Sequence, residues 1–157
     1  MVAFTSEDGG LILWAQDDDL GDEPISWNRV QLPVLKGRSI TSIAFGGGKF
    51  IIGAQEKMYY ADSTNLSVWT EIPTSVHGFG FYWINDIAFG DGIFVAAGDH
   101  AKYAYAEPEN ITTSWTKGTI TPFFADEDDI QSIAYGNGKW VAGSRMTKLA
   151  YADYSGE

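Results

Sequence analysis

One pattern of about twelve residues occurs three times in this chain of 157 residues. The copies begin at Ser42, Asp86 and Ser132, and each runs through Ile-Ala-aromatic, a Gly-x-Gly turn and a second apolar segment. The central isoleucines are residues 43, 87 and 133, so the spacings are 44 and 46 residues. A period of this length, combined with strand-forming sequence, is typical of arrays of small β-sheets.

Each repeat predicts four short strands. The first strand ends at the Gly-x-Gly turn, whose glycines supply the positive φ that a tight hairpin requires. The second and third strands are rich in aromatic and β-branched residues, and the fourth carries a tryptophan followed by Thr or Asn (Trp27, Trp69, Trp115). No long stretch has helical spacing, so the chain is predicted to be all-β. Four-stranded units of this length are typical of β-propeller blades, whereas a β-sandwich, the alternative, has no reason to repeat its sequence.

The repeats predict a single domain over residues 1–157, with blades at about 1–33, 38–75, 83–121 and 130–157. The first blade lacks its first strand and the last lacks its fourth, which gives 3 + 4 + 4 + 3 strands. Unpaired strand edges favour association, so we expect a homo-oligomer. Three arrangements stay open: a larger ring closed with a second copy, a four-bladed miniature, or a fragment or open arc that docks on something larger.

The repeat also resembles a known family. Ile-Ala-Tyr-Gly-Asn-Gly-Lys-Trp-Val-Ala at 133–142, Tyr-Ala-Asp at 151–153 and Trp-Thr at 115–116 resemble the sialidase-like propeller repeats, also called bacterial neuraminidase or Asp-box repeats. The family's box, Ser/Thr-x-Asp-x-Gly-x-Thr-Trp, is degenerate here, for example at 60–65 before Trp69. Such a box ties a turn together through side-chain hydrogen bonds and carries no catalysis. The resemblance implies a propeller whose ligand sites lie on one loop face.

Composition excludes several functions. Asp and Glu number 21 against 10 Lys and Arg, and the net charge of −11 disfavours binding to nucleic acid or to an anionic membrane. The absence of cysteine excludes disulfides and thiolate metal sites. No secretion signal or membrane-spanning segment is indicated, so we expect a protein that is cytoplasmic as made or part of a particle. No cofactor is implied.

Catalysis is not predicted. The resemblance to sialidases implies three arginines that hold a substrate carboxylate, but Arg29, Arg38 and Arg145 do not lie in the family's Arg-Ile-Pro phrase. The two histidines have no ligand-spaced partners. Weak calcium candidates lie in one acidic loop, and a solvated loop is the preferred interpretation there and at 126–129. These calcium candidates are Asp17, Asp19 and Asp22.

Binding residues are instead expected on the loops between the second and third strands of a blade and between the fourth strand and the next blade. These loops share one face of a propeller, and loops on a rigid scaffold often carry function. The aromatic loop at 77–83 suits a sugar or a protein partner, although capping of the blade packing by Phe79, Phe81 and Trp83 is the preferred interpretation. The candidate ligand-binding residues are Gln55, Glu56, His77, Phe79, Tyr82, Trp83, Asp99, His100 and Arg145.

The sequence therefore predicts a non-enzymatic β-propeller interaction module that self-assembles, binds a protein or glycan partner, or does both. The alternative is a structural component of a larger particle, such as a virion or a surface assembly. A partial, inactive sialidase-like hydrolase is a third interpretation.

Overall fold

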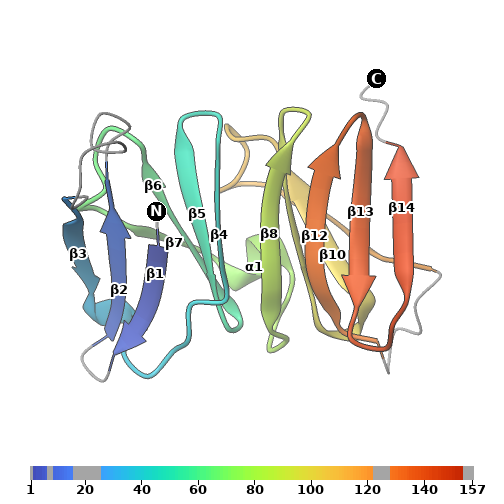
Figure 1. Cartoon of the computed structure of the whole chain (residues 1–157), viewed down its shortest axis with the longest axis horizontal. Coiled ribbons are helices and arrows are strands. Elements are labelled where there is room, and N and C mark those ends of the chain that lie inside the picture. Colours follow the sequence, from blue (N-terminus) through green and yellow to red (C-terminus); the bar gives the residue numbers. More distant parts are fainter. Residues whose placement is uncertain (1, 7–8, 16–25, 122–127, 154–157) are drawn as a thin grey trace. The chain divides into compact units, whose positions relative to one another are not determined.

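The computed structural model describes residues 2–6, 9–15, 26–121 and 128–153, and its regular structure is almost entirely antiparallel β-sheet (Figure 1). The chain divides into two compact units, Met1–Ile40 (unit one) and Thr41–Glu157 (unit two). The all-β prediction is confirmed, and the four sheets agree with the expected blade number and with the 3 + 4 + 4 + 3 strand count. None of the described helices is long and apolar enough to cross a membrane.

Unit one contains sheet I, in which β1 (Val2–Ser6), β2 (Gly9–Trp14) and β3 (Asn28–Leu32) pair in chain order. A short 3-10 turn, η2 (Pro33–Leu35), follows β3. Leu35 packs so closely on β2 that a Cβ at Gly10 would lie 2.6 Å from its Cδ1 atom. Ile12, Leu32 and Leu35 are buried, so the turn closes one face of the sheet.

Unit two contains three separate sheets, each formed by consecutive strands. Sheet II is β4 (Ser42–Gly46), β5 (Lys49–Ala54), β6 (Lys57–Asp62) and β7 (Thr70–Ile72). Sheet III is β8 (Ile84–Gly90), β9 (Ile93–Gly98), β10 (Lys102–Ala106) and β11 (Thr116–Thr119). Sheet IV is β12 (Ile130–Gly136), β13 (Lys139–Ser144) and β14 (Leu149–Asp153). The first strands meet, because β8 contacts both β4 and β12, and a one-turn helix, α1 (Thr74–His77), lies between sheets II and III in sequence (Figure 1).

The repeated Gly-x-Gly turns are two-residue hairpins, but the two glycines have different roles. The positive φ angles belong to the middle residue and the second glycine, for example 53° at Gly47 and 72° at Gly48. The first glycine is required for close packing instead. An added Cβ at Gly46 would lie 2.0 Å from the ring of Phe89, and the ring of Tyr135 occupies the same place at Gly90. The first glycines of the first two repeats therefore each receive an aromatic ring from the next sheet, whereas an added Cβ at Gly136 would meet nothing within 4 Å.

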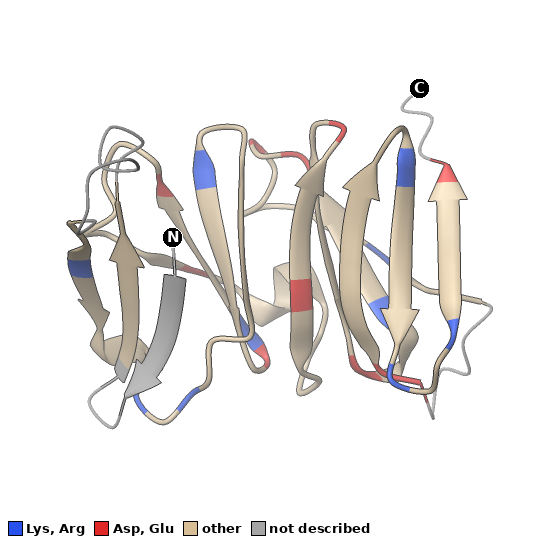
Figure 2. Cartoon of the chain, in the orientation of Figure 1, with Lys and Arg blue, Asp and Glu red and all other residues tan. Residues whose placement is uncertain are grey.

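Two apolar clusters hold the sheets of unit two together. The cluster between sheets II and III includes Ile51, Met58, Phe94 and Trp115. The cluster between sheets III and IV includes Val95 and Trp140. Charged residues gather at strand ends and in turns, while the strands are mostly uncharged, as Figure 2 shows. Asp86, which lies within β8, departs from this pattern.

Asp86 joins the first strands of all three sheets in unit two. Its Oδ1 atom accepts hydrogen bonds from Ser42 Oγ in sheet II at 2.6 Å and from the Ile87 amide at 2.9 Å. Its Oδ2 atom accepts from the Ile133 amide in sheet IV at 2.8 Å and from Ser132 Oγ at 3.3 Å. The equivalent positions in the other two repeats hold serine, so one carboxylate and two hydroxyls form a single network.

Replacing Asp86 with alanine should destabilise the protein. Two amides and two hydroxyls would lose a charged acceptor in a partly buried place, so we expect a loss of about 2–4 kcal/mol in the free energy of unfolding. Urea denaturation followed by circular dichroism measures the change. Glu109→Gln, which neutralises an exposed carboxylate, is the matched control and should change stability by less than about 0.5 kcal/mol. An equally small change for Asp86→Ala would contradict the bridging role.

Candidate binding face

The loops that carry the sequence-derived candidates lie next to one another. The Ile84 amide donates to the Gln55 carbonyl at 2.8 Å, which joins the β5–β6 turn to the start of β8. The Asp99 amide donates to the Trp83 carbonyl at 3.1 Å, which joins η3 (Asp99–Ala101) to the 77–83 loop. The Arg145 amide donates to the Asp129 carbonyl at 3.0 Å. These loops of sheets II, III and IV form what we call the loop face.

The aromatic loop at 77–83 divides between core and surface. His77 is fully buried and Phe79 is 1% exposed, so Phe79 caps the packing between sheets II and III. Phe81, by contrast, is 95% exposed and Trp83 is 46% exposed. Phe81 was not among the candidates derived from the sequence. Glycines and aromatic residues alternate in this loop, and that pattern does not indicate which aromatic ring faces solvent.

Tyr82 is held by two neighbours from sheet III. Its ring lies 4.4 Å from the His100 ring, centroid to centroid, at an angle of 51°. The Lys102 Nζ atom lies 3.9 Å from the centroid of the same ring, within the range of a cation–π contact. Tyr82 is therefore fixed between an imidazole and an ammonium group.

Asp99 fixes the start of β8 beneath these aromatic residues. Its Oδ2 atom accepts a hydrogen bond from the Trp83 amide at 3.0 Å, and its Oδ1 atom accepts from Asn85 Nδ2 at 3.1 Å. The Asn85 side chain also donates to the Ile130 carbonyl of sheet IV at 2.9 Å. Asp99 therefore acts as a positioning residue for Trp83.

His100 adopts an unusual backbone conformation, with φ 60° and ψ 35°. Left-handed conformations cost a non-glycine residue about 1 kcal/mol and persist where surroundings impose them. Here the His100 amide donates to Asp129 Oδ1 at 3.3 Å, and the Ala101 amide donates to the Asp128 carbonyl at 2.7 Å. The segment before β12 thus holds the turn that presents the His100 ring to Tyr82.

The remaining candidates lie at the margins of the loop face. Gln55 has φ 56° and contributes its carbonyl, while Glu56 is half-buried beside it. The Arg145 side chain is 72% exposed, and its Nη1 atom lies 3.8 Å from Asp129 Oδ2. Asp129 consequently links Arg145 to His100. The structure brings Tyr82, Trp83, Asp99 and His100 together and leaves Gln55, Glu56 and Arg145 around them.

The calcium candidates Asp17, Asp19 and Asp22 lie outside the described residues. Asp128, from the second acidic run, is 1% exposed and forms an ion pair with Lys148 at 2.5 Å. Within the described ranges, no group of three His, Asp or Glu side chains is placed to hold a metal ion.

His77 is the last residue of α1 and is fully buried. Its Nδ1 atom accepts a long hydrogen bond from the Phe79 amide at 3.4 Å, and among the described residues its Nε2 atom has no partner. Burial, followed by the charges of Lys57 and Lys117, lowers the pKa of His77 to about 4, against a weaker opposite effect of Glu71. The imidazole is therefore neutral at physiological pH.

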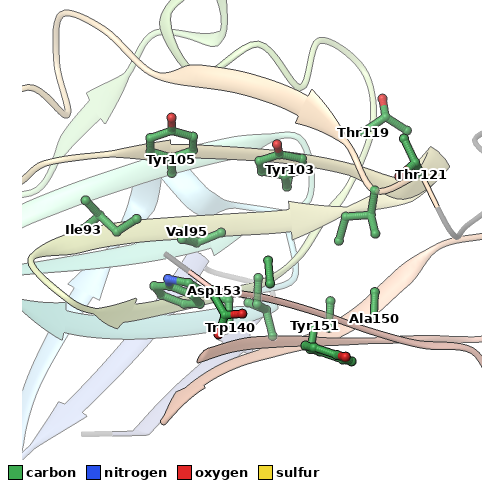
Figure 3. A pocket seen from close by; sticks show the side chains of 14 residues that line it. Ile93, Val95, Tyr103, Tyr105, Thr119, Thr121, Trp140, Ala150, Tyr151 and Asp153 are labelled. Atoms are coloured by element: carbon green, nitrogen blue, oxygen red, sulfur yellow. The ribbon is translucent and has the colours of Figure 1, made fainter. Parts of the chain in front are cut away.

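A second concave feature lies between sheets III and IV, away from the aromatic loop. It is a cavity of about 470 Å³ whose lining includes Tyr103 and Tyr105 of β10 and Trp140 of β13 (Figure 3). Sequence reasoning missed this cavity, because it depends on which segment packs between two sheets. The repeat contains a signal that could have indicated the cavity. Residues 140, 142, 150 and 152 of sheet IV are equivalent to residues 94, 96, 104 and 106 of sheet III, which form the wall of the preceding interface.

Comparison with solved structures supports the fold. The chain is similar to YCF48 bound to D1 peptide, with a TM-score of 0.63 and 12% identity over 94% of this chain and 47% of that one. It is also similar to the β-propeller domain of Cps50 (Swd1) from Myceliophteria thermophila, with a TM-score of 0.59 and 12% identity over 96% of this chain and 47% of that one. Apo AztD from Citrobacter koseri gives a TM-score of 0.55 and 13% identity over 97% and 42%.

These neighbours are β-propeller proteins, so the propeller class expected from the repeats is supported by structure. The chain spans less than half the length of each of these three proteins. No protein-family model and no curated protein sequence matches the chain.

The buried neutral His77 predicts that stability falls in mild acid. Its pKa is about 6.5 when unfolded and about 4 when folded, so below pH 6.5 the unfolded chain takes up more protons than the native one. The stabilisation is complete above pH 6.5 and is lost as the pH falls toward 4. Between pH 7 and pH 5 this group should remove about 2 kcal/mol.

Urea denaturation at both pH values, in wild type and in His77→Phe, measures this effect. Carboxylates also titrate in this interval, so the informative quantity is the difference between the two proteins. The variant should show a smaller loss by about 2 kcal/mol. A control variant at an exposed apolar residue, Val68→Ser, should keep the wild-type dependence on pH. Identical pH profiles for wild type and His77→Phe would refute the assignment.

Proposed function

We propose that this chain is a β-propeller interaction module that binds a protein partner through its loop face and catalyses no reaction. One observation carries the proposal: Phe81 is almost fully exposed beside the half-exposed Trp83. Exposed aromatic residues on a protein surface are characteristic of binding sites, and Trp is enriched among residues that dominate binding energy.

The frame beneath these aromatic residues supports binding with little loss of conformational freedom. Trp83 is fixed through its amide by Asp99, and Tyr82 is fixed between His100 and Lys102. A surface that is already ordered gives up less entropy on association, so more of the contact energy appears as affinity.

The chemistry of the loop face supports a binding role over hydrolysis. The exposed guanidinium of Arg145 lies near Asp129, and the two histidines are engaged in packing and ring contacts. The chain has three arginines in all, so a clamp for a substrate carboxylate would need all of them at one place. In this proposal the resemblance to sialidase repeats reflects the scaffold and not the activity.

One similar structure adds a precedent for the type of ligand. YCF48 has been solved with a peptide bound, although its 12% identity to this chain speaks for the fold alone. We prefer a protein to a glycan because Phe81 and Trp83 expose apolar rings in the same loop, and aromatic residues of this kind dominate binding energy in protein interfaces. A lectin-like role is the competing outcome of the test.

The test is selection of binding peptides from a display library on the folded protein, with affinity measured by biolayer interferometry. Binders should lose at least about tenfold in affinity on Phe81→Ser or Trp83→Ser. Phe45→Ser is the matched control, because Phe45 is 52% exposed but lies on β4 away from the loop face, and it should have no effect. Binders that ignore Phe81 and Trp83, or binding found only on a glycan array, would refute the proposal.

Self-association is a second candidate function, and a separate observation favours it. Leu149 and Tyr151 on β14 are each 71% exposed, while their repeat equivalents Tyr103 and Tyr105 are half-buried against sheet IV. Alternation along β14 points them to the face opposite Ala150. Among the described residues of unit two, no further sheet packs on this face of sheet IV. A second copy of the chain could cover the face in the way that sheet IV covers Tyr103 and Tyr105.

Light scattering coupled to size-exclusion chromatography tests self-association. We expect a dimer or larger assembly for wild type and a monomer for the double variant Leu149→Lys/Tyr151→Lys, because two charges would have to be desolvated at the contact. Val68→Lys, at a 59% exposed apolar residue elsewhere, should leave the mass unchanged. A monomeric wild type at concentrations of about 100 μM would exclude this second function, since stable homodimers normally bind more tightly than that.

A further inference from the structure

The cavity between sheets III and IV has two distinct walls. Val95, Tyr103 and Tyr105 form one wall, and Trp140 and Ala150 lie on the other (Figure 3). Its volume of about 470 Å³ lies in the range of ligand-binding cavities. Most of the lining is apolar, and its polar residues are the tyrosines, Thr119, Thr121 and Asp153.

The preceding interface shows what fills such a space in this fold. Phe94, Ala96, Ala104 and Ala106 of sheet III face sheet II, and they belong to one buried cluster with Ile111 and Trp115. Ile111 is 1% exposed and Trp115 is 4% exposed, and the Trp115 indole donates to the Ile111 carbonyl at 2.7 Å. The segment that leads into β11 therefore fills the room that the small alanines of β10 leave.

Sheet IV presents the same wall with that segment missing from the described residues. The residues that lie 46 positions after those four residues of sheet III are Trp140, Ala142, Ala150 and Ala152. Within the described part of the chain, β14 pairs with β13 alone, so its outer edge is free. The alanines of β14 consequently border the cavity where those of β10 border Trp115.

Trp140 adds a polar requirement to the cavity. It is 7% exposed, and its Nε1–H group has no acceptor among the described residues. A buried donor without a partner costs about 1–3 kcal/mol, so an incoming acceptor would recover that energy. The equivalent Phe94 has no such donor, so this feature is particular to the groove between sheets III and IV.

We propose that this groove binds a peptide segment in which a turn, carrying an aliphatic residue and, four positions later, a tryptophan, leads into a short strand, as Ile111 and Trp115 lead into β11. The segment pairs with the free edge of β14, its tryptophan fills the cavity above Ala150 and Ala152, and one of its carbonyls accepts the hydrogen bond from Trp140 Nε1. Addition of a strand to a free sheet edge is an established mode of peptide recognition, in which pockets for side chains give specificity. The proposal applies the packing seen between sheets II and III to the next interface, between sheets III and IV. It does not depend on binding at the loop face.

A synthetic peptide with the sequence of residues 110–119, Asn-Ile-Thr-Thr-Ser-Trp-Thr-Lys-Gly-Thr, is the probe. Fluorescence anisotropy of the labelled peptide measures its affinity for the whole chain. Nitrogen-15 NMR follows the Trp140 indole, which should shift on binding. The same peptide with alanine in place of its tryptophan should bind at least about tenfold more weakly.

Three protein variants locate the site. Ala150→Phe fills the cavity and should abolish binding, whereas Val68→Phe, a similar change at an exposed residue outside the groove, should leave it unchanged. Trp140→Phe keeps a ring but removes the donor and should weaken binding about three- to tenfold. Phe94 holds the equivalent place in sheet III, so Trp140→Phe should fold and keeps the test decisive even where Ala150→Phe does not fold.

Several outcomes would overturn the proposal. The first is the absence of saturable binding up to about 1 mM peptide. The second is equal affinity of the peptide for wild type and Trp140→Phe. The third is a shift of the Trp115 indole signal and not of the Trp140 signal, which would mean that the peptide displaces residues 110–119 of the protein itself. A fourth outcome concerns self-association of the protein. If Ala150→Phe abolishes self-association and the peptide does not compete with it, the groove binds a second copy of the chain, and the proposal is refuted.

Discussion

The sheets of unit two do not pair with one another, so side chains along their first strands decide how the sheets dock. Asp86 is the centre of this docking, because one carboxylate accepts hydrogen bonds from Ser42 in sheet II and from the Ile133 amide in sheet IV. Thr41 and Asn85, which are equivalent in the repeat, each add a hydrogen bond to a carbonyl of the next sheet, at Ile84 and Ile130. The apolar clusters then close the space further along the strands.

The loop face follows from this docking. Asn85 lies one residue before Asp86, and its side chain contacts both Asp99 and sheet IV, so the connection that fixes the sheets also fixes the loop that ends at Trp83. The exposed Phe81 is therefore presented by a framework that is already ordered. Loops on a rigid scaffold commonly carry function, and here the side chains of Asp99 and Asn85 hold the loop that presents the aromatic residues.

Much of the fold could be predicted from the sequence, because the repeat shows its strands three times. The isoleucines at 43, 87 and 133 lie in three separate sheets, and the hairpins form where glycine was expected. The role of Gly46 could not be predicted, since it depends on a ring from the next sheet. The candidate site was predicted less well for the same reason: spacing places Phe79 and Phe81 in one loop, but only packing between sheets decides that Phe79 is buried and Phe81 exposed.

The amide of Ile133 reports on the central claim directly, because its hydrogen bond crosses from sheet IV to Asp86 in sheet III. Native-state hydrogen exchange at this amide measures the contact between the sheets and not the pairing within one sheet. We predict slow exchange in wild type, and in Asp86→Ala we predict faster exchange at Ile133 while the strand-paired amides of β13 stay protected. Rapid exchange of the Ile133 amide in wild type, or no change in the variant, would show that Asp86 does not hold the sheets together.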